Sequence, residues 1–293
     1  MKISGCTFVR NGFLLGYPVK ESLHSLLSFC DEVVIAIGDS EDDTLSYVLS
    51  LNDPKIRVIQ TIWDDTMREG GHILAQQTNI ALAQCSGDWV IYLQADEVLN
   101  EDDMPKLKVA MEQADKRSDI DGLLFDYLHF FGDYAHIGMG RQWYRKEIRA
   151  FKNTRNITSW KDAQGFRKVI ADGTFKKLTV MECGTYVYHY GWVRNPSAYL
   201  RKQAAFSRLY HDDAWLCENL PTSEDFPMCY ELGKFEGKHP SIMIPRIKHD
   251  ESWTLKFNPK RTKPRPLAVA ICDGIEQITG KRIFEYRNYE LKK

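Results

Sequence analysis

The sequence contains no cysteine framework. Its seven cysteines are odd in number and widely spaced, and no two of them form a Cys-x-x-Cys pair. Disulfide scaffolds and zinc knuckles both need closely patterned cysteines, so both classes are excluded. We expect reduced, mostly buried thiols, as in a cytoplasmic protein.

Long apolar runs and an excess of positive charge are also missing. No run reaches the roughly 18 residues that a membrane-spanning helix needs, and the first ten residues are too short and too polar for a signal peptide. The 39 Lys and Arg nearly balance the 40 Asp and Glu, which leaves no net attraction for nucleic acid. We expect no nucleic-acid partner, and any membrane contact would be peripheral, at the inner face.

Strand and helix patterns alternate through the first hundred residues. The expected strands are 2–9, 32–37, 56–60 and 89–93, and the expected helices are 21–29, 45–51 and 73–83. Short connections between alternating strands and helices are typical of an α/β protein with a Rossmann-like, mostly parallel sheet and helices on both faces. Ligands of such sheets bind beyond the carboxyl ends of the strands.

Polar side chains follow each expected strand. They are Arg10 and Asn11 after the first, Asp39 after the second, Arg68 in the loop after the third, and Gln94 and Asp96 after the fourth. Because these strand ends meet at one edge, we expect one ligand site there. Asp39 is suited to accept from a ribose hydroxyl or a base N–H. The alternative role for Asp39 is to cap the next helix, which Ser40, Asp42, Asp43 or Thr44 could do equally well.

The stretch Gly87–Glu97 is an apolar strand that ends in acidic residues. Carboxylates at a strand end are hard oxygen ligands that suit a divalent cation beside a diphosphate. The same stretch is compatible with a buried strand followed by a solvated acidic turn, because acidic residues continue to Asp103.

Five short motifs occur in an order that is characteristic when they are taken together. They are Phe8–Gly12, Cys30–Val34, Gly38–Ser40, Gln76–Asn79 and Leu93–Glu97. This ordered set resembles the family 2 glycosyltransferases, which have the nucleotide-sugar-binding GT-A fold, and in particular bacterial cell-surface polysaccharide and lipopolysaccharide-core transferases. The resemblance implies a catalytic GT-A domain over residues 1–195. The polarity changes after Pro196, so residues 196–293 are expected to form a helical and irregular extension on the acceptor side.

The resemblance also implies roles for individual residues. An Asp-x-Asp motif in the family binds Mn²⁺ or Mg²⁺; here it is Gln94-Ala95-Asp96, with an amide in place of the first carboxylate. Asp96 is then the metal ligand, and Gln94 hydrogen-bonds a ribose or sugar hydroxyl. Asp39 contacts the base, and the loop with Arg10 and Asn11 lines the nucleotide pocket.

The second half must supply a base and further ligands. A helix at 105–114 and strands at 122–132 and 145–152 are expected before Asp162, which lies among Trp160, Lys161 and Arg167. The resemblance makes Asp162 the carboxylate that removes the acceptor proton during an inverting transfer. A loop salt bridge to Lys161 or Arg167 is the structural alternative.

An aromatic strand around His189 is the next candidate. The resemblance makes His189 a metal ligand that Mn²⁺ tolerates better than Mg²⁺, although a lone strand histidine is also an ordinary structural residue. Arg194 lies close in sequence and suits diphosphate oxygens, since a guanidinium binds phosphate bidentately.

The C-terminal hundred residues change character. A helix is expected over 197–210, followed by an irregular acidic segment with Trp215 and Cys217, and then by a basic, proline-rich stretch at 255–266. That stretch fits a solvated loop, and it fits contact with an anionic acceptor or a membrane surface.

Three functions remain. The first is a metal-dependent, inverting glycosyltransferase of polysaccharide biosynthesis that moves a sugar from a nucleotide sugar to a saccharide or lipid-linked saccharide; exposed aromatics would suit a homodimer. The second, suggested by Gln94, is a non-catalytic nucleotide- or glycan-binding protein. A sugar nucleotidyltransferase is disfavoured, because residues 10–16 lack the glycine-rich cationic loop that such enzymes carry after their first strand.

Overall fold

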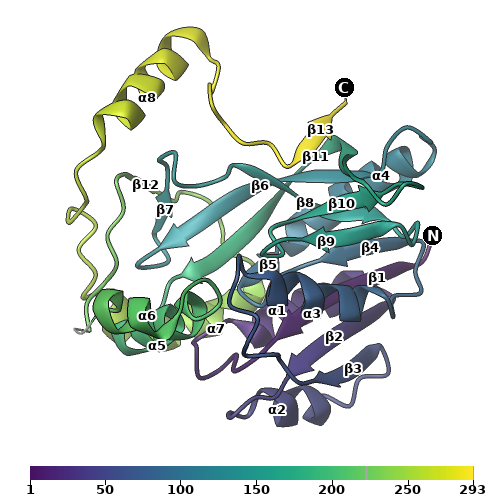
Figure 1. Ribbon diagram of the computed structural model, residues 1–293, viewed down its shortest axis with the longest axis horizontal. Coiled ribbons are helices and arrows are strands. Elements are labelled where there is room, and N and C mark those ends of the chain that lie inside the picture. Colours follow the sequence, from purple (N-terminus) through teal and green to yellow (C-terminus); the bar gives the residue numbers. More distant parts are fainter. Residues whose placement is uncertain (222–223, 293) are drawn as a thin grey trace.

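The computed structural model describes residues 1–221 and 224–292. A large mixed sheet forms its centre (Figure 1), in the order β3-β2-β1-β4-β8-β6-β11-β10-β9. The strands on this path are β1 (Ile3–Val9), β2 (Glu32–Gly38), β3 (Ile56–Thr61), β4 (Trp89–Tyr92), β6 (Gly122–Phe131), β8 (Lys146–Lys152), β9 (Ile157–Trp160), β10 (Gly165–Val169) and β11 (Phe175–Trp192). Four short strands pair beside it: β5 (Glu97–Leu99), β7 (His136–Gly138), β12 (Leu232–Lys234) and β13 (Tyr289–Leu291).

The first four strands of this path are parallel, as expected. Side chains alternate along β2: Val33 and Ile35 pack with α1 (Val19–Phe29), and Val34 packs with α3 (His72–Leu82) on the opposite face. Because successive strand residues point to opposite faces, an almost wholly apolar strand requires a helix on each side. The expected α/β architecture is confirmed. The short α2 (Thr44–Ser50) follows β2.

The second half turns the sheet from parallel to mixed. β8 lies antiparallel between β4 and β6, and the 18-residue β11 runs parallel to β6. The helix expected before β6 is α4 (Met104–Asp115). The acidic-turn interpretation of residues 97–103 is wrong at its start: Glu97–Leu99 forms β5 and pairs with β11, and only Glu101–Asp103 forms a short 3₁₀ turn.

The segment around Asp162 is a tight hairpin rather than a loop. β9 and β10 pair antiparallel, and Lys161 and Ala163 in the turn between them both have positive φ angles, 53° and 60°. Positive φ is uncommon for residues other than glycine. The turn therefore holds Asp162 in a fixed position.

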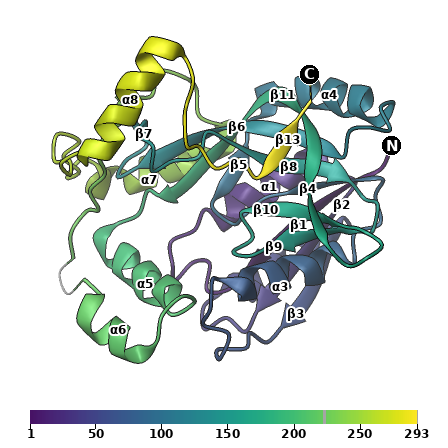
Figure 2. The same cartoon turned by 45° about the horizontal axis from the view of Figure 1, so that its top comes forward.

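The C-terminal extension is mainly helical, with α5 (Pro196–Ser207), α6 (Asp213–Asn219), α7 (Ile244–Thr254) and α8 (Leu267–Thr279). Asn195 and Asp212 cap α5 and α6 through their side-chain oxygens, as short polar residues do at helix starts. Trp215 and Cys217 therefore lie on a helix and not in an irregular segment. The chain ends with β13, parallel to β11 (Figure 2).

Membrane-spanning helices are not found among the described residues: none of these helices is long and apolar enough to cross a bilayer.

Candidate active site

The candidate site lies at the carboxyl ends of β1, β2, β3 and β4, beside the segment that leads into α5. Arg10, at the end of β1, joins two loops: its guanidinium contacts Asp39 at 3.1 Å and Asp65 at 2.8 Å. It also lies over the ring of Trp63, 5.5 Å from the ring centroid. A flat aromatic and a cation beside a partly exposed carboxylate are suited to hold a nucleobase and ribose.

Asn11 and Asp39, which were expected to contact the nucleotide, lie in the loops after β1 and β2. The Asn11 side-chain oxygen accepts from the backbone N–H of Glu41 at 2.7 Å, and the backbone N–H of Asn11 donates to the Ser40 hydroxyl. Asn11 thereby fixes the loop after β1 to the loop after β2. Asp39 does not cap α2, because Asp42 accepts from Thr44 there.

Arg68 lies at the outer side of these loops. Its guanidinium contacts Asp213 of α6 at 2.6 Å and the carbonyl of Asp65. The contact joins the loop after β3 to the C-terminal extension, so Arg68 is occupied by α6 in this arrangement.

Asp96 is the centre of a buried charge cluster. It is 5% exposed and follows β4. Its Oδ2 lies 3.3 Å from Lys202 and 3.5 Å from Arg194, while its Oδ1 lies 3.7 Å from Nε2 of His189. Burial acts to raise the pKa of this carboxyl, but electrostatic interactions with Lys202, His189 and Arg194 hold it well below its usual range. Asp96 is therefore a carboxylate at neutral pH.

A histidine pair determines which nitrogen of His189 faces Asp96. His129 lies 2.8 Å from the carbonyl of Tyr144 through Nε2 and 2.9 Å from His189, with the two Nδ1 atoms in contact. Burial lowers the pKa of His129 to about 3 and that of His189 to about 4, so both are neutral at pH 7.

The hydrogens can then be assigned. A carbonyl only accepts, so His129 donates from Nε2 and accepts at Nδ1. His189 must donate from its own Nδ1, which leaves the lone pair of its Nε2 directed at the Asp96 carboxylate. Two electron-pair donors at 3.7 Å need a cation or a hydrogen donor between them.

Gly191 packs closely against both residues. A Cβ at this position would lie 2.4 Å from Nε2 of His189 and 2.8 Å from Oδ2 of Asp96, so any side chain here would force His189 or Asp96 to shift. One carboxylate oxygen and one neutral imidazole nitrogen are a donor set that a divalent cation accepts. Among the described residues, no group of three or more His, Cys, Asp or Glu side chains is placed to hold a metal, so these two protein ligands would have to be completed by the donor diphosphate or water.

A buried ion pair holds the loop that carries Gln94 and Asp96. Glu97 and Arg149 are both fully buried, with nitrogen–oxygen distances of 2.8 and 2.9 Å. Glu97 also accepts from the backbone amide of Gln94 at 3.0 Å, and Arg149 donates to the carbonyl of Gln164 at 2.8 Å. The pair thereby links the Asp96 loop to the hairpin turn of Asp162.

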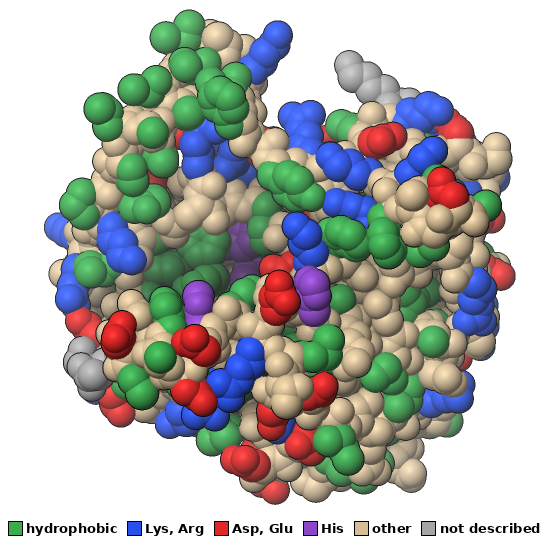
Figure 3. All heavy atoms as spheres, in the orientation of Figure 1, with side chains coloured by type: hydrophobic (Ala, Val, Ile, Leu, Met, Phe, Trp, Pro, Cys, Tyr) green, Lys and Arg blue, Asp and Glu red, His purple; other side chains and the backbone are tan. Residues whose placement is uncertain are grey.

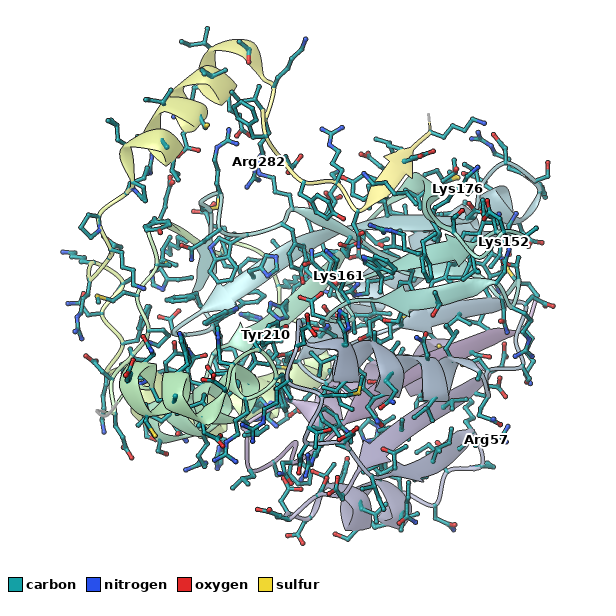
Figure 4. All side chains as sticks on the ribbon, viewed as in Figure 1. Arg57, Lys152, Lys161, Lys176, Tyr210 and Arg282 are labelled. Carbon is teal, nitrogen blue, oxygen red and sulfur yellow. The ribbon has the colours of Figure 1, made fainter. Side chains whose placement is uncertain are left out.

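Asp162 lies in that turn and is partly exposed. Neither Lys161 nor Arg167 forms a salt bridge with it within the described parts of the chain; Arg167 instead donates to the carbonyls of Phe166 and Asn288. Tyr210, just after α5, lies against Asp162, and burial together with this carboxylate raises the pKa of the Tyr210 hydroxyl. Figure 4 labels Tyr210 and Lys161 in the middle of the molecule, where the hairpin and the α5 segment come near each other.

Comparison with known families supports a single assignment. Residues 17–173, more than half of the chain, match the model of glycosyl transferase family 2. The chain belongs to this family. The expectation of a glycosyltransferase is thereby confirmed. The search of curated proteins found no match to this sequence.

Solved structures give only distant likenesses to this glycosyltransferase. TarS from S. aureus is 16% identical to this chain, with a TM-score of 0.42. The match covers 70% of this chain and 39% of the TarS chain, so this chain spans about two fifths of that protein. Glucosyl-3-phosphoglycerate synthase from Mycobacterium tuberculosis, in complex with Mg²⁺ and UDP, is 17% identical over 44% of this chain and 43% of its own, with a TM-score of 0.30. The family assignment rests on the sequence match alone.

The candidate site includes residues that sequence patterns did not single out. They are Trp63, His129, Arg149 and Lys202. Lys202 lies 106 positions from Asp96 along the chain, and no local motif signals such a contact. Lys202 and Arg194 both lie over the ring of Tyr17, 5.1 and 4.6 Å from its centroid. Burial and the Arg194 charge lower the pKa of Lys202 to about 8, although Asp96 acts to raise it.

Proposed function

We propose that this protein transfers a sugar from a nucleotide-sugar donor to a hydroxyl of a saccharide or lipid-linked saccharide, with inversion and with the help of Mn²⁺ or Mg²⁺. The observation that carries the metal requirement is the facing pair of Asp96 Oδ1 and the unprotonated Nε2 of His189, 3.7 Å apart above Gly191. Both atoms present electron pairs, and no hydrogen lies between them.

Each expected residue then has a role in donor binding. Arg10, Asp39 and Trp63 hold the nucleoside, and Gln94 hydrogen-bonds a hydroxyl of the ribose or the sugar. Asp96 and His189 hold the cation, which when bound neutralises diphosphate charge. Lys202 and Arg194 form the second positive group beside the same carboxylate, and they are suited to the phosphate oxygens.

Asp162 is proposed as the base. It accepts the proton of the acceptor hydroxyl while that oxygen forms a bond to the anomeric carbon of the donor. The bond from this carbon to the diphosphate oxygen breaks on the opposite face, and Arg194 and Lys202 meet the negative charge of the leaving group. Attack and departure on opposite faces invert the anomeric centre.

Residues 1–195 are proposed as the nucleotide-sugar domain and residues 196–293 as the acceptor side. Lys202 and the Tyr210 segment support this division, because both come from the extension and contact Asp96 or Asp162. We further propose that the enzyme acts in the cytoplasm, in polysaccharide biosynthesis; the seven free cysteines suit a reducing compartment.

The test separates binding from transfer. UDP-GlcNAc and UDP-glucose serve as first probes, with Mn²⁺ present, and release of free UDP is measured in the presence of saccharide acceptors. We expect Asp162→Asn to bind the donor as the wild type does and to release UDP roughly 10² to 10⁴ times more slowly. Asp172→Asn, an exposed turn residue, is the matched control.

Two outcomes would contradict the proposal. Equal rates for Asp162→Asn and the wild type would remove Asp162 as the base. Tight, metal-dependent binding of donor by the wild type with no release of UDP in any acceptor mixture would favour the non-catalytic binding protein that Gln94 suggests.

A further inference from the structure

Helix α8 turns its polar face towards the protein and its apolar face away from it. Arg141 anchors the polar face: it contacts Asp273 at 2.7 Å and Glu276 at 2.9 Å and donates to the carbonyl of Cys272. Arg145 adds a second contact to Glu276 at 2.6 Å. No residue of the 13-residue helix is buried. Surface helices of globular proteins ordinarily have the reverse orientation.

The outward face of α8 carries an apolar stripe. Leu267, Ile271 and Ile278 are 78%, 56% and 87% exposed and share one side of the helix by their spacing. The segment after the helix adds Phe284, which is 92% exposed, whereas Tyr286 is held at the sheet, where its hydroxyl accepts from Arg167 at 2.9 Å. Figure 1 shows α8 apart from the sheet, and Figure 3 shows hydrophobic side chains gathered over it.

Positive charge flanks this stripe at both ends. Lys260 and Lys263 precede the helix and Lys281 follows it; all three are exposed, and none has an ion pair within the described residues. The acidic residues of α8, Asp273 and Glu276, form ion pairs with arginines on the inner side of the helix. The outer face therefore combines apolar side chains and unpaired lysines with no unpaired carboxylate.

We propose that α8 and the segment through Phe284 form a docking surface for an anionic lipid membrane. An exposed apolar helix face buries itself at the headgroup boundary, and flanking lysines are attracted by anionic lipid. The proposal does not depend on the donor site. Membrane docking would bring the enzyme to the bilayer surface at which a lipid-linked acceptor lies.

A second copy of the chain is the competing occupant, and two observations disfavour it. A stable dimer interface involves about 20–30 residues and about 800 Å² on each partner, whereas this surface offers four large side chains, Leu267, Ile271, Ile278 and Phe284. A two-fold pairing of α8 would also bring the lysines of both copies near each other, where like charges repel.

Flotation of the full-length protein with vesicles tests the proposal. One set of vesicles is phosphatidylcholine alone, and the other contains an equal amount of phosphatidylglycerol. We expect binding to the anionic set only, weakened by salt. The double variant Ile271→Glu, Ile278→Glu should bind at least roughly tenfold more weakly, and Lys263→Gln and Lys281→Gln should each weaken binding about fivefold.

Matched variants keep the test specific. Leu49→Glu with Val109→Glu places the same charges at exposed apolar positions of α2 and α4 and should bind vesicles as the wild type does. Circular dichroism of all variants verifies the fold. No binding of the folded wild type to anionic vesicles, or equal binding to both vesicle sets, would overturn the proposal. Vesicle binding that persists in the α8 variant would also overturn it, as would a dimer of the wild type that this variant converts to a monomer without any vesicle binding.

Discussion

His129 acts on the proposed metal site through His189. It accepts the Nδ1 hydrogen of His189 and thereby leaves the other nitrogen free beside Asp96. Partners of this kind fix the tautomer and the ring orientation of a metal ligand, and their loss weakens metal affinity by about 10- to 100-fold. Burial of both rings makes the effect independent of pH in the neutral range.

Replacement of His129 by Leu therefore tests the assignment of the hydrogens. We expect Mn²⁺ to bind about 10- to 100-fold more weakly, measured by calorimetry with a nucleoside diphosphate present. His249→Leu is the control, because its side chain is 87% exposed. Unchanged Mn²⁺ affinity in His129→Leu would show that His189 is not held in this way or is not a ligand.

Glu147 predicts a pH dependence of stability away from the site. Burial raises the pKa of its carboxyl from 4.5 to about 7, although Arg149 and hydrogen bonds from Ile148, Gln164 and Asn288 act to lower it. The unfolded chain releases this proton near pH 4.5 and the folded protein near pH 7. Stability is therefore greatest below pH 4.5 with respect to this group and falls as the pH rises towards 7.

Urea unfolding at pH 5 and pH 8 measures this contribution. Between the two pH values the free energy of unfolding of the wild type should fall by an amount on the order of 3 kcal/mol. Glu147→Gln removes the ionisation, so this fall should be absent from the variant. Its amide is able to donate to the side-chain oxygen of Asn288, which has no partner. The same pH dependence in both proteins would mean that Glu147 ionises normally in the fold.

The end of β11 supplies both His189 and the glycine that packs against it. Gly191 lacks the Cβ that would lie 2.4 Å from His189 and 2.8 Å from Asp96. Gly274, in the middle of α8, has nothing within 4 Å of the same position. The two glycines thus differ in what an added methyl group meets, and they form a matched pair.

Alanine at each position distinguishes the two. Gly191→Ala should retain its secondary structure and lose at least 90% of its Mn²⁺-dependent nucleotide affinity, roughly the tenfold lower bound for a disturbed ligand. Gly274→Ala should bind nucleotide normally and gain about 0.5–1 kcal/mol from helix propensity. Normal nucleotide binding by a folded Gly191→Ala would place the cation elsewhere.

Local patterns predicted the first half of the fold, because each strand there is a short apolar run between turn residues. They did not predict that Glu97 is buried. It stands in a run of acidic residues, and only its pairing with Arg149, 52 positions away, explains its burial. The contacts of Asp96 with Lys202 are likewise long-range. Sequence patterns thus singled out Asp96, His189 and Arg194, and the packing of α5 added Lys202 beside them.

The molecule brings together a donor edge, a base-carrying hairpin and a helical extension. The Glu97–Arg149 pair connects the first two, and Lys202 connects the extension to Asp96. Figure 3 shows a hollow between α8 and the α5–α6 region, with hydrophobic and histidine side chains on its wall. Under the proposed function, this hollow is where an acceptor saccharide would approach the edge that binds the donor.

The most direct test is the thermal unfolding of the wild type and Asp96→Ala with a panel of nucleoside diphosphates, each with and without Mn²⁺. A ligand at about 100 times its Kd stabilises the folded state by about 2.7 kcal/mol, which for a chain of this size is several degrees in Tm. We predict such a rise for at least one nucleoside diphosphate in the wild type, only when Mn²⁺ is present, and none in Asp96→Ala. A rise that is equal without metal, or equal in Asp96→Ala, would contradict the account of the site.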